Sequence, residues 1–191
     1  MNEQHWESFE TSKPEFNLLP EGEHNLRIIR FEILNSFLQY NGAPKEDLPA
    51  YQNPCPQVAI TVVAADEGKS GGLTFRLNRV GFVKMSELPE KEQKKHEDID
   101  GWACSKDDDG DLVRSMDPEK TKACENIINQ LAGALGIPVG SNFLDALEEA
   151  RENQTMFRGT VTNEPYDGKD QFRLGRFRTA TVVAAESDFE D

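Results

Sequence analysis

Residues 26–33, Leu-Arg-Ile-Ile-Arg-Phe-Glu-Ile, set the first expectation about the fold. Apolar and charged residues alternate with the period of two that a half-buried β-strand requires, but the alternation changes phase at Ile28-Ile29. A single phase change within a strand is typical of a β-bulge, which bends the strand and increases its twist. Such a bent strand suits a small closed barrel, in which strands curve sharply.

Four further segments have the composition and alternation of strands. They are residues 57–65, 73–78, 156–162 and 171–178. A helix is predicted between the third and fourth of the five strands, because Asp117 suits the N-cap, Pro118 the first helical position and Gly136 the end. A second helix is expected over about 142–153. This order predicts a mainly β, α+β protein with a five-stranded, OB-fold-like Greek-key barrel and a helix pair between strands three and four.

The chain outside this barrel is expected to be polar. Residues 1–15 are predicted to form an acidic N-terminal arm, 16–183 the OB-fold domain, and 184–191 a disordered acidic tail. Within the domain, residues 86–117 contain few apolar side chains and are predicted to be a polar insert, in which only 90–95 has the pattern of a short helix.

Charge excludes some functions for this 191-residue chain. It has 35 acidic and 21 basic residues, giving a formal net charge of -14, which disfavours coating duplex nucleic acid or an anionic membrane by bulk charge. The segments that contain the strands differ from the rest. Residues 26–85 contain seven basic and five acidic residues, and residues 151–185 contain six and four. The sequence therefore predicts a mildly basic sheet with acidic appendages, although acids that merely solubilise loops are an equal alternative.

No arrangement of residues predicts catalysis. The three histidines are scattered, and no phosphate-binding loop or nucleophile motif occurs, so we expect no enzyme, cofactor or metal. Residues 107–111 are similar to part of a calcium loop, but Met116 stands where a bidentate Glu is needed. No apolar run approaches the roughly 18 residues of a membrane span, and no signal peptide is recognisable. Three widely spaced cysteines favour a reducing cytoplasm.

Aromatic and basic residues form the one informative pattern. In an OB barrel the ligand binds on strands two and three and on the loops that join strands 1–2 and 4–5, and all three tyrosines fall in those loops. Bases stack on aromatic rings for about 1–3 kcal/mol each, while Lys and Arg bind phosphates. The alternative is an ordinary solvent-facing surface. The predicted nucleic-acid-binding residues are Tyr40, Tyr51, Arg76, Arg79, Arg158, Tyr166, Lys169, Arg173, Arg176 and Phe177.

Phe177 and the acidic C-terminal tail each allow two interpretations. Phe177 is assigned either to the surface or to the core, because Gly175 permits a change of phase within its strand. The acidic tail is predicted either to compete with nucleic acid for the basic groove or to place its aromatic ring in a partner protein. The tail residues are Glu186, Asp188, Phe189, Glu190 and Asp191.

Short motifs over about residues 16–180 give the chain a family resemblance. They are 19–23 (Leu-Pro-Glu-Gly-Glu), 131–136 (Leu-Ala-Gly-Ala-Leu-Gly), 157–161 (Phe-Arg-Gly-Thr-Val) and 171–174 (Gln-Phe-Arg-Leu). With these motifs the chain resembles phage-encoded single-stranded DNA-binding proteins with an OB-fold. The resemblance implies sequence-independent, non-catalytic binding and protection of single-stranded DNA in phage replication or recombination, often as a homo-oligomer, in the host-cell cytoplasm.

The resemblance also implies that the acidic tail recruits replication or recombination proteins. The tail departs from the bacterial form, because two acids follow Phe189 and the ring does not end the chain. A second hypothesis, from another class, is an acidic protein–protein interaction module that binds a host protein or imitates the charge of DNA. The net charge of -14 favours it directly. Titration of a poly-dT strand at low salt separates the two hypotheses.

Overall fold

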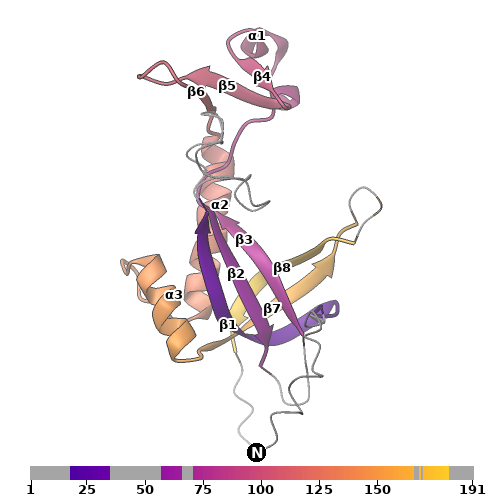
Figure 1. The fold of residues 1–191 in the computed structure, drawn as a ribbon, viewed down its shortest axis with the longest axis vertical. Helices are drawn as coiled ribbons and strands as arrows, with labels where there is room; N and C mark the ends of the chain where they lie inside the picture. Colours follow the sequence, from indigo (N-terminus) through magenta and orange to yellow (C-terminus); the bar gives the residue numbers. More distant parts are fainter. Residues whose placement is uncertain (1–17, 35–56, 66–70, 166–167, 169, 181–191) are drawn as a thin grey trace, which may run out of the picture.

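The computed structural model describes residues 18–34, 57–65, 71–165, 168 and 170–180. Within these residues it contains a five-stranded antiparallel sheet, a separate three-stranded sheet and three α-helices, so the expected mainly β, α+β class is confirmed (Figure 1). The large sheet consists of β1 (Gly22–Leu34), β2 (Gln57–Ala64), β3 (Gly72–Asn78), β7 (Met156–Asn163) and β8 (Phe172–Thr179). The small sheet consists of β4 (Glu97–Ile99), β5 (Trp102–Lys106) and β6 (Leu112–Arg114). The helices are α1 (Glu90–Gln93), α2 (Pro118–Ala134) and α3 (Phe143–Glu152).

Strand β1 is the centre of the large sheet, whose order is β3-β2-β1-β7-β8. Its first half pairs with β7 and its second half with β2, and the register with β2 shifts between Ile28 and Arg30. The β-bulge expected at this point is therefore confirmed. The bulge adds one residue to β1, so Ile28 and Phe31 face the same side of the sheet although they are three positions apart. Both face the core, opposite Val62 and Ile60 of β2.

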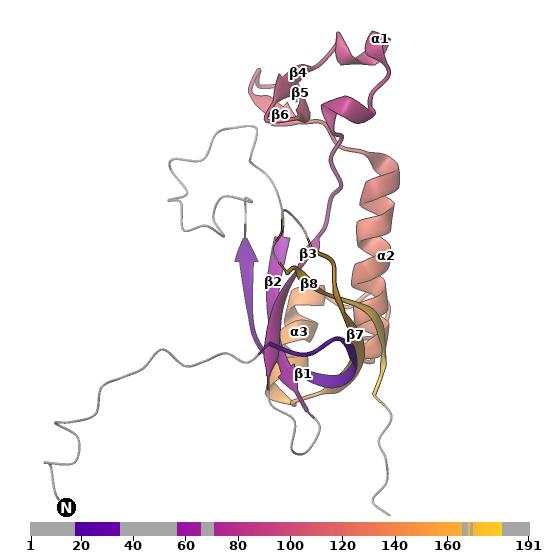
Figure 2. The same cartoon turned by 90° about the vertical axis from the view of Figure 1, so that its right-hand side faces the viewer.

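The large sheet is open between its edge strands in the described part of the chain. No hydrogen-bonded ladder joins β3 to β8, so the closed barrel expected from the sequence is not observed. The two edges nevertheless approach each other, since the rings of Phe75 and Phe177 lie 5.6 Å apart. Helix α2 packs against both β3 and β8 and lies along this open side (Figure 2). Packing of α2 against β3 and β8 therefore takes the place of hydrogen bonding between these two edge strands.

Both longer helices begin where the sequence predicts. The Asp117 side chain accepts hydrogen bonds from the backbone N–H groups of Glu119 and Lys120, at 2.9 and 3.1 Å, and Pro118 is the first residue of α2. Gly136 follows the helix with a φ of 73°, a left-handed conformation that favours glycine. Asn142 caps α3 by accepting from the N–H of Leu144 at 3.0 Å.

The core lies between the inner face of the large sheet and the two helices. Each strand contributes alternate residues, and α2 and α3 contribute one stripe each. Burial of such a side chain stabilises the fold by about 1.5–3 kcal/mol. Fully buried members from five different elements are Leu26, Ile60, Leu131, Leu147 and Phe157.

The insert has more structure than the sequence predicts. Besides the short helix α1, it contains the sheet β4–β6 and a 3-10 turn at Met85–Glu87. The structured insert spans residues 82–116 and so begins before the predicted 86–117. Its buried apolar residues, Phe82, Met85, Ala103 and Cys104, do not belong to the main core. The insert projects beyond the end of α2, away from the large sheet (Figure 1). In the described ranges, no helix is long and apolar enough to cross a membrane.

The insert is joined to α2 by close backbone contacts. The N–H of Asp117 donates to the carbonyl of Gly81 at 2.9 Å, and the N–H of Gly81 donates to Oγ1 of Thr121 at 3.1 Å. The chain therefore enters and leaves the insert at almost the same place, against the first turn of α2.

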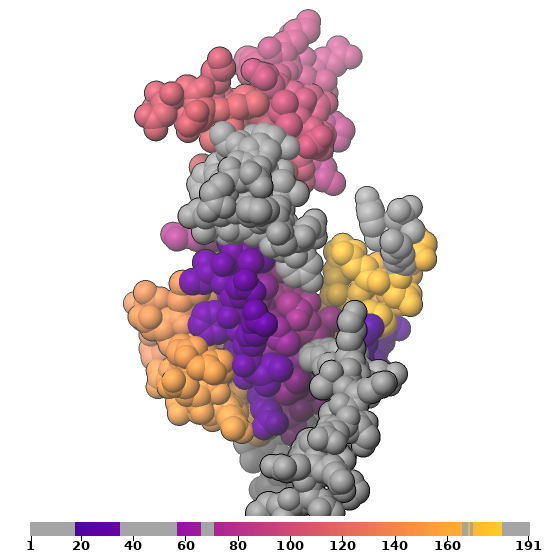
Figure 3. All heavy atoms as spheres, viewed as in Figure 1, coloured from indigo at the N-terminus to yellow at the C-terminus, as the bar shows by residue number. Residues whose placement is uncertain are grey.

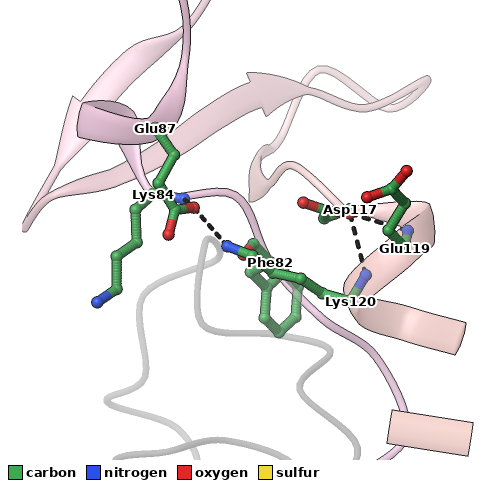
Figure 4. Close-up of polar contacts among 6 residues, drawn as sticks. All are labelled: Phe82, Lys84, Glu87, Asp117, Glu119 and Lys120. Atoms are coloured by element: carbon green, nitrogen blue, oxygen red, sulfur yellow. Dashed lines mark hydrogen bonds and ion pairs between the residues drawn. The ribbon is translucent and has the colours of Figure 1, made fainter. Parts of the chain in front are cut away.

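Lys120 completes this junction from α2 (Figure 4). Its Nζ donates to the carbonyl of Phe82 at 3.1 Å and to the carboxylate of Glu87. The hydrogen bond from Lys120 lowers the pKa of Glu87, and a hydrogen bond from the backbone N–H of Lys84 acts in the same direction. These contacts hold the base of the insert in one orientation relative to α2.

Candidate nucleic-acid interface

The outer face of β3 carries the polar residues that its alternation predicts. Leu73, Phe75 and Leu77 are buried, at most 7% exposed, and face the core. Because successive side chains of a strand point to opposite faces, Arg76 lies on the outer face together with Thr74 and Asn78. Arg76 is half-buried there.

Cross-strand register extends this polar face to β1. Arg30 pairs with Thr61, which pairs with Thr74, and the two threonine hydroxyls lie 2.9 Å apart. In the next row, Glu32 and Arg76 both neighbour Ala59. Arg30 also reaches Glu32, with 3.2 Å between guanidinium nitrogen and carboxylate oxygen. The site prediction omitted Arg30, because only the pairing register shows that it shares a face with Arg76.

A second group of arginines lies on β7 and β8. Arg158 and Arg178 are directly opposite each other in the ladder. Glu23 of β1 lies beside both, 4.0 Å from the guanidinium of Arg158 and 3.8 Å from that of Arg178. One carboxylate thus serves two guanidinium groups, which leaves an excess of positive charge. Arg178 is a further residue that the site prediction omitted.

Arg173 is also on the outer face, opposite Thr162 of β7. It forms an ion pair of 2.8 Å with Glu164, and both side chains are more than half exposed. Exposed ion pairs of this kind contribute only about 0–1 kcal/mol. A phosphate can therefore replace the carboxylate at little cost.

Phe177 is not available as a stacking surface. A register shift between β7 and β8 leaves one extra residue near Arg176, whose φ is 52°. The shift turns Phe177 inward, where it is 7% exposed and packs 5.6 Å from Phe75 and 5.9 Å from Phe157. Its assignment to the nucleic-acid interface is therefore corrected: it is a core residue.

Arg79 is separated from the other predicted residues. It follows the end of β3 and lines a hollow that faces α2 and α3, where Glu125 is also present. Its side chain therefore belongs to the helix side of the molecule, so the predicted arginines do not all share one surface. The chain turns after Asn78, and strand alternation no longer predicts direction there.

Arg176 is exposed at the register shift of β8, with no partner residue in the β7 ladder. The other predicted residues lie outside the described ranges. On the outer face of the large sheet, no aromatic side chain is present among the described residues, because the phenylalanines of its strands all face the core. The undescribed predicted residues are Tyr40, Tyr51, Tyr166, Lys169, Glu186, Asp188, Phe189, Glu190 and Asp191.

Among the residues with a described position, no three His, Cys, Asp or Glu side chains gather to hold a metal ion. Burial raises the pKa of the thiols of Cys104 and Cys124, which keeps them protonated and poorly nucleophilic. No protein-family model matches the sequence, and no curated protein is similar to it. The arginine-bearing face is therefore interpreted from its geometry alone.

Proposed function

We propose that this protein binds single-stranded DNA without sequence preference and protects it during phage DNA replication or recombination, with no catalytic step. One observation carries the proposal: arginines from four strands share the outer face of a bent five-stranded sheet. They are Arg30, Arg76, Arg158, Arg173 and Arg178.

The strand arrangement supports an OB-fold-like architecture. The first strand is bulged and pairs on both sides, the next two strands follow it on one side, and the last two return to its other side after a helix pair. This is the connectivity of a five-stranded, partly open Greek-key barrel. In that architecture the outer face of strands two and three is a binding surface for oligonucleotides.

The charges on this face suit a phosphate backbone. Guanidinium groups donate parallel hydrogen bonds to phosphate oxygens. The described acids that pair with Arg30, Arg158, Arg173 and Arg178 are Glu23, Glu32 and Glu164, and each is more than half exposed. Water and salt already weaken such pairs, so a phosphate competes effectively for the arginines.

Fluorescence anisotropy of a labelled poly-dT strand over a series of salt concentrations tests the proposal. We expect binding at low salt, with a logarithmic salt slope of about 0.7 for each phosphate neutralised. The double variant Arg158→Gln/Arg178→Gln should bind several-fold more weakly, and its slope should fall by about 0.7 for each phosphate that is no longer neutralised. Duplex DNA of equal length serves as the comparison ligand.

The matched control is Arg151→Gln. Arg151 lies on α3, where its Nε donates to Glu148 at 2.9 Å, so this variant removes one positive charge away from the sheet. It should leave poly-dT affinity unchanged. Equal weakening in the control and the double variant, or no binding at low salt, contradicts the proposal. The second outcome favours an acidic protein-binding module, the alternative that the net charge of -14 supports.

A further inference from the structure

The helix side of the molecule contains an apolar hollow that the arginine-bearing face does not use. It has a volume of about 550 Å³ and lies between α2, α3 and the adjacent ends of the first three strands. Helix α3 packs directly beside β1, as the space-filling view also shows (Figure 3). The apolar side chains that line the hollow are Ile33, Val58, Leu77, Ile128, Phe143 and Leu144.

Two other hollows adjoin this one around the segment that joins α2 to α3. A hollow of about 320 Å³ shares Ile128 and Phe143 with it and extends to Val139. A third, of about 450 Å³, shares Pro138 with the second and Asn142 with the first. We call the three together the helix-side trough. Apolar residues of the first and second hollows remain exposed, since Ile33 is 54% exposed and Val139 is fully exposed.

The trough has an acidic border. Among the described residues that line it, Glu125 lies in the first hollow together with the guanidinium of Arg79, and Asp145 and Glu149 lie in the third. Moreover, residues 126–150 contain no lysine or arginine. An apolar floor between carboxylates is complementary to an apolar segment that carries positive charge.

Charge argues against occupants other than a basic partner. Single-stranded DNA is an anion and is repelled by the carboxylates. The chain's own longer undescribed segments carry more acid than base: residues 1–17 contain four acids and one lysine, residues 35–56 two acids and one lysine, and residues 181–191 four acids and no base. A second copy of the chain brings a net charge of -14. A cationic segment of a different protein is favoured over each of these.

We propose that the helix-side trough docks a basic amphipathic segment of a partner protein, with leucine-like side chains in the hollows and Lys or Arg beside Glu125, Asp145 and Glu149. The site is separate from the outer face of the sheet. It requires neither DNA binding nor the acidic tail, so the failure of one proposal leaves the other standing.

The probe is a synthetic helical peptide of leucine and lysine in amphipathic order, titrated into the full-length ¹⁵N-labelled protein. Amide shifts in two-dimensional NMR should concentrate in residues 125–149 and in the strand ends that line the first hollow. A peptide of the same composition in scrambled order carries the same charge without an apolar face. It should bind at least about tenfold more weakly, because burying about one leucine side chain is worth that factor.

Variants at the exposed apolar residues of the first and second hollows test the apolar contribution. The double variant Ile33→Ser/Val139→Ser should lower peptide affinity about tenfold, because the peptide then buries less apolar surface in both hollows. Met116→Ser is the matched control, because Met116 is 65% exposed and lies outside the trough. Its amide spectrum and peptide affinity should match the parent protein.

Three outcomes overturn the proposal. The first is equal affinity for the ordered and scrambled peptides, which means charge attraction alone. The second is a set of amide shifts spread over unrelated acidic stretches such as residues 107–111. The third is dimerisation of the peptide-free protein through the same amides, which assigns the trough to a second copy.

Discussion

At the scale of single residues, Arg114 holds the insert together. It is 8% exposed, and its guanidinium carbon lies 4.5 Å from the ring centre of Trp102 and 5.8 Å from that of Phe82. The two rings meet edge to face at 6.4 Å. A planar guanidinium stacks on an aromatic face, whereas an ammonium group acts as a compact point charge. Arginine is therefore specifically suited to this position.

We expect Arg114→Ala to destabilise the insert by about 2 kcal/mol, the value of a desolvated cation–π contact. Arg114→Lys should recover only part of this stability, because it keeps the charge but not the planar group. Hydrogen exchange of the β4–β6 amides measures the effect, and amides of the large sheet should not change.

Arg30→Ala is the control for Arg114, because the Arg30 side chain is 72% exposed and its ion pair with Glu32 lies on the surface. Its effect on stability should stay within about 0.5 kcal/mol. An Arg114→Ala protein with parent-like exchange in the insert would show that the stacking is incidental.

At the scale of elements, local chemistry predicts most of the large sheet and both longer helices. The bulge at Ile28-Ile29, the cap at Asp117 and the stop at Gly136 follow from side-chain alternation, a carboxylate acceptor and a left-handed φ. These signals lie within a few residues of the feature that they specify. For that reason a single sequence is enough to predict them.

Other features depend on contacts between distant segments and could not be predicted in this way. The strands of the insert are short, and β4 and β6 have only three residues each, too few for an alternation to be recognised. The inward turn of Phe177 depends on a register shift against β7. Likewise, alternation placed Arg76 on a polar face, but only pairing shows that Arg30 lies on the same one.

At the junction between β3 and α2, the chain packs so closely against the helix that an added side-chain atom would clash. A Cβ atom on Gly81 would lie 2.2 Å from Cβ and 2.6 Å from the carbonyl carbon of Lys120. Backbone atoms of a helix cannot move aside cheaply. We therefore expect Gly81→Ala to destabilise the protein by about 3 kcal/mol in urea unfolding, through a shift of the first turn of α2.

Gly133→Ala is the matched control. Gly133 lies within α2, the helix that Gly81 contacts, and a Cβ atom on Gly133 would meet no atom within 4 Å. Alanine at an unobstructed helical position stabilises by about 0.5–1 kcal/mol, so this variant should unfold at higher urea. Equal midpoints for the two variants would contradict the packing argument.

At the scale of the whole molecule, charge and apolar surface are divided between two sides. Arginines gather on the outer face of the large sheet, while carboxylates border the apolar trough beside α2 and α3. Under the two proposals, a chain with a net charge of -14 presents its arginines to one ligand and its carboxylates to another. Averaged composition conceals this separation.

The core of the large sheet and its helices is formed without any residue of the insert. The main core contains no residue from 82–116, and the hydrogen bond of 2.9 Å between Asp117 and Gly81 brings the two ends of the insert together. Replacing residues 82–116 by a two-residue turn such as Asn-Gly should therefore leave a folded protein. Circular dichroism and a single cooperative urea transition are the measurements, and poly-dT affinity should persist.

Deleting α3 provides the contrast for this excision. That helix contributes Leu147 and Ala150 to the main core, and Leu147 is fully buried. Its removal exposes the inner surface of β1 and eliminates several kcal/mol of apolar burial, so the shortened chain should not unfold cooperatively. If excision of the insert abolishes folding as completely as deletion of α3, the insert and the sheet form one cooperative unit, and the two cores do not fold independently.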